Sequence, residues 1–130
     1  MIDDFAACGI SKPQDIRDLF AKNFYFGCEA DDPMNAWGFN RQVNPYGAQL
    51  KTLFGSDIGH FDVSDMKEVL VEAHELVDDK VITEDDFRDF VYTYPVEFWG
   101  GMNPNFFKGT VVEQQAAKLL QVGAGARTNA

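Results

Sequence analysis

Apolar residues along the chain follow two patterns, helical spacing and short unbroken runs. Ile16, Leu19 and Phe20 recur at helical spacing, after Ser11 and Pro13, two residue types that favour a helix start. Similar spacing predicts a loose helix over about 34–44 and a clearer one over about 64–78. Further helices are predicted from about 84, after Thr83, and over about 111–121.

Two short apolar runs, residues 23–28 and 49–55, predict buried strands that end near a glycine and lead into acidic loops. The glycines Gly27 and Gly55 are 28 residues apart, which matches one strand–helix repeat of a parallel α/β fold, about 30 residues. Two strands are too few for a barrel of eight such repeats, which needs roughly 240 residues. We therefore expect the end of a larger α/β domain.

The charge and composition of the chain exclude some classes of binding partner. The chain has 130 residues, of which 21 are acidic and 11 are Lys or Arg, for a net charge of −10. This balance argues against binding to nucleic acid or to an anionic membrane surface, and no apolar stretch approaches the roughly 18 residues of a membrane span. The acidic N-terminus is unlike a signal peptide, and the two cysteines do not suggest a disulfide scaffold, so a cytoplasmic protein is expected. Residues 123–130 are expected to form a flexible tail.

Acidic residues follow both predicted strands, where α/β folds bind their ligands. Glu29, Asp31 and Asp32 follow the first strand, and Asp57 and His60 follow the second. A carboxylate in this position can bind a divalent metal or act as a general base. Helix capping is the favoured role for three of the aspartates: Asp31, Asp32 and Asp62. For Asp57, capping and chemistry both stay open.

The segment Phe54-Gly55-Ser56-Asp57-Ile58-Gly59-His60 resembles the last-strand motif of the amidohydrolase-related branch of the metal-dependent amidohydrolase superfamily, which commonly has Gly-Ser-Asp, two residues and His. Residues 23–33, 85–90 and 103–109 are also similar to that family, and the resemblance extends from about residue 10 to 120. It implies that residues 1–122 are the C-terminal portion of a (β/α)8 TIM barrel. That portion would hold the last two βα units and the C-terminal helices.

The resemblance also implies an activity. Family members bind one or two divalent metals, often zinc, and either use metal-activated water against a C–N or C–O bond of a small molecule or decarboxylate a small acid. Asp57 matches the family's metal ligand and general base. Glu29 would be a second carboxylate near the metal or the substrate, and His60 would contact substrate or hold the loop. Many members have Pro before this His, where this chain has Gly59.

The remaining metal ligands of that family are missing here. The chain has two histidines, His60 and His74, and neither is part of the family's His-x-His motif. A zinc site needs at least three protein ligands. We therefore expect the 130-residue chain to bind little or no metal and to be catalytically incomplete by itself. It would be a C-terminal fragment, with Met1 either the start of a truncated gene or an internal Met of a longer frame.

A second hypothesis is that the chain is not an enzyme but a small acidic interaction domain. It would dimerise or dock on a partner through exposed strand edges, because unpaired edges present free backbone hydrogen-bonding groups.

Overall fold

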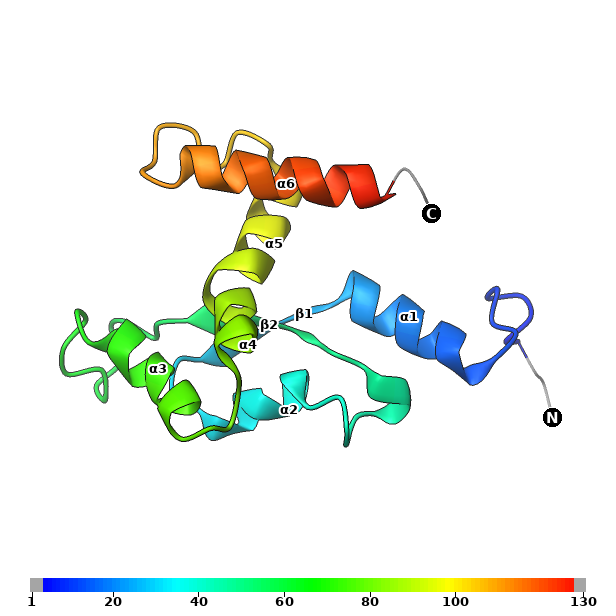
Figure 1. The fold of residues 1–130 in the computed structure, drawn as a ribbon, viewed down its shortest axis with the longest axis horizontal. Helices are drawn as coiled ribbons and strands as arrows, with labels where there is room; N and C mark the ends of the chain where they lie inside the picture. The colour runs from blue at the N-terminus through cyan, green and yellow to red at the C-terminus, as the bar shows by residue number, and fades with distance from the viewer. Residues whose placement is uncertain (1–3, 128–130) are drawn as a thin grey trace.

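The computed structural model describes residues 4–127 and the side chains of residues 4–122 (Figure 1). Two short strands lie at the centre, with helices around them. In chain order, the elements are α1 (Pro13–Asn23), β1 (Tyr25–Glu29), η1 (Pro33–Asn35), α2 (Ala36–Phe39), η2 (Pro45–Gly47), β2 (Lys51–Gly55), α3 (Val69–Asp78), α4 (Glu84–Arg88), η3 (Asp89–Thr93), α5 (Tyr94–Met102) and α6 (Glu113–Arg127).

Both predicted strands are present, and they pair with each other in parallel. The register runs from Tyr25 opposite Lys51 to Glu29 opposite Gly55. A Cβ atom at Gly55 would lie 2.9 Å from the carbonyl oxygen of Cys28, closer than a real Cβ approaches backbone. Glycine at this position therefore lets the two strands meet closely at the end of the pair.

The predicted fold class, a C-terminal portion of a (β/α)8 barrel, is wrong. Helices make up 50% of the chain, and the sheet of the described residues has two strands, in the order β1–β2. The four-residue helix α2 and two short 3-10 turns link the strands, and no third strand follows in residues 56–127. The physical reason is that the segment between the strands forms only short turns and a four-residue helix, whereas a βα unit of a barrel has a full crossover helix between its strands.

Local hydrogen bonds explain where the helices differ from the sequence prediction. The side chain of Asn40 accepts from the N–H groups of Gln42 and Val43, which ends α2 early. Asp65 accepts from the N–H of Lys67 in a turn, so the helix predicted from about residue 64 begins at Val69. Helix α6 runs to Arg127, beyond its predicted end, and residues 128–130 of the predicted tail lie outside the described residues.

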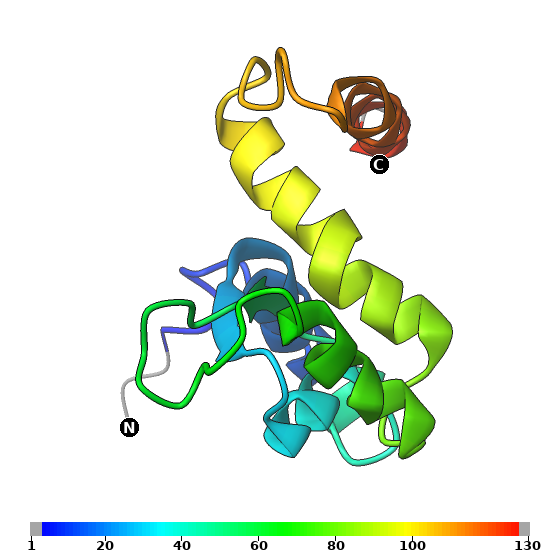
Figure 2. The same ribbon diagram turned by 90° about the vertical axis from the view of Figure 1, so that its left-hand side faces the viewer.

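The start of α4 agrees with the sequence prediction. Thr83 caps the helix, because its hydroxyl accepts from the N–H of Asp86 while the carboxylate of Asp86 accepts from the N–H of Thr83. Helix α4 then continues through the π-helical turn η3 into α5, and Figure 2 shows these elements as one long rod that reaches from beside α3 to α6.

The core is an aromatic cluster between this rod and one face of the strand pair. Phe90, in η3, is completely buried. Its ring packs edge-on against the rings of Phe54 in β2 and Phe39 in α2, with 5.8 Å and 6.5 Å between ring centres. Leu76 of α3 and Ile82 complete the buried cluster. Burial of these side chains is what attaches the helices to the two strands, since a two-stranded sheet is not stable alone.

No helix in residues 4–127 combines the length and the apolar character needed to cross a membrane.

Replacing Phe90 with Ala should lower the free energy of unfolding by about 3–5 kcal/mol, because the substitution removes a fully buried ring and leaves a cavity. Phe61→Ala is the matched control, since Phe61 is 99% exposed and its loss should change stability by less than about 0.5 kcal/mol. Urea denaturation followed by circular dichroism measures both. Equal losses in the two variants would contradict this position of the core.

Candidate functional site

The carboxyl ends of the two strands form one side of an open cavity of about 390 Å³. Because β1 ends at Glu29 opposite the last residue of β2, the residues that follow both strands meet at the same end of the pair. Glu29, Asp57 and His60, the three predicted site residues, all line this cavity. The remaining lining residues are Gly27, Cys28 and Gly55.

The loop after β2 reverses direction through consecutive tight turns. The N–H of His60 donates to the carbonyl of Asp57 at 3.1 Å, and the N–H of Val63 donates to the carbonyl of His60 at 3.3 Å. Asp57 and Gly59 both have positive φ, 49° and 110° respectively. Such backbone is favoured by glycine and tolerated by aspartate. The turns bring side chains three and five residues apart to the same region.

The imidazole of His60 pairs directly with the carboxylate of Asp57. Its Nδ1 lies 2.7 Å from Oδ2 of Asp57, while the two side chains are 68% and 30% exposed. A contact between exposed polar side chains of this kind contributes at most about 1 kcal/mol. The backbone turn, more than this side-chain contact, therefore sets where His60 lies.

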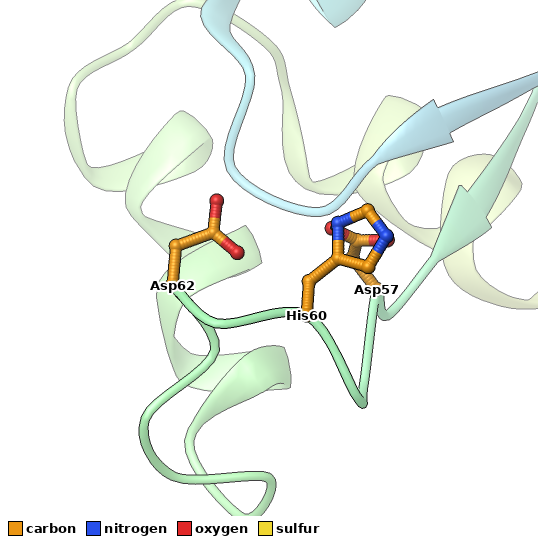
Figure 3. Close-up of side chains that lie close together, drawn as sticks. All are labelled: Asp57, His60 and Asp62. Carbon is orange, nitrogen blue, oxygen red and sulfur yellow. The ribbon is translucent and has the colours of Figure 1, made fainter.

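Asp62 is the functional candidate that sequence analysis assigned to another role. Its favoured role there was a helix cap, but the following helix begins only at Val69. In the structure, ligand atoms of Asp57, His60 and Asp62 lie within 4.8 Å of one another. Figure 3 shows the three side chains projecting from the same side of the loop. The signal in the sequence is a carboxylate two residues after His60, in a loop that contains a turn-forming glycine.

The donor set is suitable for a divalent cation. Two carboxylates and one imidazole are ordinary zinc ligands, and three protein ligands leave a position for water in a catalytic zinc site. A tetrahedral ion with bonds of about 2.1 Å holds its donor atoms roughly 3.4 Å apart. His60 and Asp62 are exposed, so their side chains can rotate to bring donor atoms that now lie within 4.8 Å of one another to this spacing.

Glu29 and the acids beside it have different surroundings. The buried side chain of Asn35 donates to the carbonyl of Glu29 at 2.6 Å, which fixes the backbone where β1 ends. Asp32 accepts from the N–H of Met34 at 2.8 Å and caps η1, as its sequence context predicts. Asp31 is exposed and is not among the residues that line the cavity.

His74 lies outside this site, on α3. Its two ring nitrogens face Asp78 at 3.4 Å and Glu84 at 3.6 Å, and its ring contacts Phe87 edge-on. Because Glu84 and Phe87 belong to α4, these contacts connect the two helices, which is a structural role.

Comparison of the chain with known protein families, with curated proteins and with solved structures finds no match.

The thiol of Cys28 should react slowly, although it lines the cavity. Burial, followed by the nearby charge of Asp32, raises the pKa of Cys28, so less of the reactive thiolate is present at a given pH. Cys8 is exposed. In Ellman's assays near pH 8, the Cys8→Ser variant, which retains Cys28, should therefore react more slowly than the Cys28→Ser variant.

The difference should disappear in urea, where both thiols are exposed to solvent, and the rate for Cys28 should rise as the pH increases. Equal rates in the folded chains would contradict the half-buried position of Cys28.

Proposed function

We propose that the chain carries part of a metal-dependent hydrolase site that acts on a small molecule, with Asp57, His60 and Asp62 as the ligands of a divalent cation. The single observation that carries this proposal is the grouping of their ligand atoms within 4.8 Å. Two of these residues also line the cavity at the carboxyl end of the strands. The resemblance of residues 54–60 to the amidohydrolase-related motif is the reason for proposing hydrolysis as the reaction. The proposal does not require a barrel fold.

A divalent cation held by Asp57, His60 and Asp62 would supply a polarised water that is a good nucleophile near neutral pH. Asp57 is the most enclosed of the three residues, and its second carboxylate oxygen would serve as the proton acceptor. Glu29 lies on the neighbouring strand, where its carboxylate orients a substrate that enters the cavity. The bond attacked is a C–N or C–O bond, with decarboxylation of a small acid as the other reaction type of the resembling family.

Asp62 changes the expected ligand count. From the sequence, the ligands amount to one carboxylate and one histidine, too few for tight zinc binding. With Asp62 the count reaches three, the number in many catalytic zinc sites. We therefore propose that the chain binds one divalent ion by itself, more weakly than a fully enclosed site would.

A non-enzymatic interaction domain is the second candidate, and one observation favours it. Within the described residues, β1 and β2 each have one edge with no partner strand. Such edges favour association with another chain. Light scattering that reports a dimer, together with no metal-dependent hydrolysis, would favour this candidate over the first.

Metal binding tests the ligand set directly. Titration of the metal-free chain with Zn²⁺ in a calorimeter should give about one ion per chain, and Asp62→Asn should weaken binding at least about tenfold because one of the two carboxylate ligands is lost. Asp65→Asn is the matched control. Asp65 lies in the same loop and carries the same charge, but it accepts from the N–H of Lys67 and is not in the cluster.

Equal affinity in Asp62→Asn and the wild-type chain would remove Asp62 from the site. Equal weakening in Asp62→Asn and Asp65→Asn would mean that the ion responds only to the overall negative charge of −10.

Activity tests the role of Asp57. In the longest natural form of the protein that contains this chain, Zn²⁺-dependent hydrolysis of small amides and esters should fall by several orders of magnitude on Asp57→Ala, because a ligand and the proton acceptor are lost together. Asp65→Ala should retain the wild-type rate. Retained hydrolysis in Asp57→Ala would eliminate Asp57 from the mechanism.

A further inference from the structure

Gly59 has a backbone conformation that L-residues rarely adopt. Its φ is 110°, and a Cβ atom built on it meets nothing within 4 Å. Space is therefore not what requires glycine at this position, because a methyl group would fit. The backbone dihedral alone requires it.

The turn at Gly59 controls the position of His60. It lies between the carbonyl of Asp57 and the N–H of His60, which form a hydrogen bond of 3.1 Å. The turned chain leaves Nδ1 of His60 only 2.7 Å from the carboxylate of Asp57. Because the side chain of His60 is 68% exposed, little packing holds the imidazole there, so the backbone must do so.

We propose that Gly59 is a positioning residue, whose left-handed backbone turns His60 onto Asp57 and so assembles the cluster of Asp57, His60 and Asp62. Proline, confined to φ near −65°, is unable to form this turn. The role in metal binding rests on the proposed function, whereas the positioning of His60 on Asp57 does not.

The test compares Gly59→Ala with Gly109→Ala. Gly109 also has positive φ, 80°, and also has nothing within 4 Å of its Cβ position, but it lies outside the cluster, in the segment between α5 and α6. Both variants should lose a similar amount of stability, because both place an L-side chain on left-handed backbone. If the His60–Asp57 contact or the Zn²⁺ affinity differs between the two variants, the difference therefore reports the positioning of His60 and not general backbone strain.

The first measurement uses the metal-free chain. Ring ¹⁵N shifts of His60, and nuclear Overhauser contacts between its ring and the β protons of Asp57, should show the pair in the wild-type chain and in Gly109→Ala. Both signals should be lost in Gly59→Ala. Gly59→Asn should recover part of them, because asparagine tolerates positive φ better than alanine, and it remains informative where Gly59→Ala does not fold.

The second measurement is Zn²⁺ affinity, which should fall about tenfold in Gly59→Ala and stay unchanged in Gly109→Ala. Retention of the His60–Asp57 contact in Gly59→Ala would overturn the inference, as would equal loss in both variants. If the contact depends on Gly59 while the wild-type chain binds no Zn²⁺, the proposed function fails and the positioning role of Gly59 stands.

Discussion

Parallel pairing of β1 with β2 is the interaction on which the rest of the structure depends. It brings together segments that begin 26 residues apart, Tyr25 opposite Lys51. The pair presents Phe54 and Cys28 to the aromatic core, so the helices that bury Phe90 have a surface to pack against. It also places Glu29 beside the loop that carries Asp57. The close contact at Gly55 is therefore a packing requirement at the end of the pair that carries the cavity.

The two ends of the strand pair have different roles. At the amino end, the ammonium of Lys51 lies 3.1 Å from the hydroxyl of Tyr25 and 3.5 Å from the carboxylate of Glu97, which ties both strands to α5. The same ammonium lies 4.6 Å from the centre of the Tyr25 ring, a cation–π contact. The carboxyl end instead carries the open cavity and the strained loop. The contacts that tie the strands to α5 thus lie at the opposite end of the strand pair from the cavity.

The candidate site consists of the end of β1 and the exposed loop after β2. The backbone at Glu29 is fixed by a hydrogen bond from the buried side chain of Asn35, whereas His60 and Asp62 lie on a loop whose shape is set by its own turns. Exposed side chains cost little to desolvate but are less preorganised than enclosed ones, so the backbone turn has the larger influence on their geometry.

The sequence by itself determined the local features: both strands, the Thr83 cap, the Asp32 cap, and the location of Glu29, Asp57 and His60 at the carboxyl ends of the strands. These depend on the spacing of apolar residues and on hydrogen bonds between near neighbours, which a sequence displays directly. Tertiary structure decided the rest. The pairing of the two strands as a sheet of their own, the late start of α3 and the approach of Asp62 to His60 depend on which segments pack together and on backbone dihedrals within a loop. The spacing of Gly27 and Gly55 fits one crossover equally well in a barrel and in a single strand pair, so it did not distinguish them.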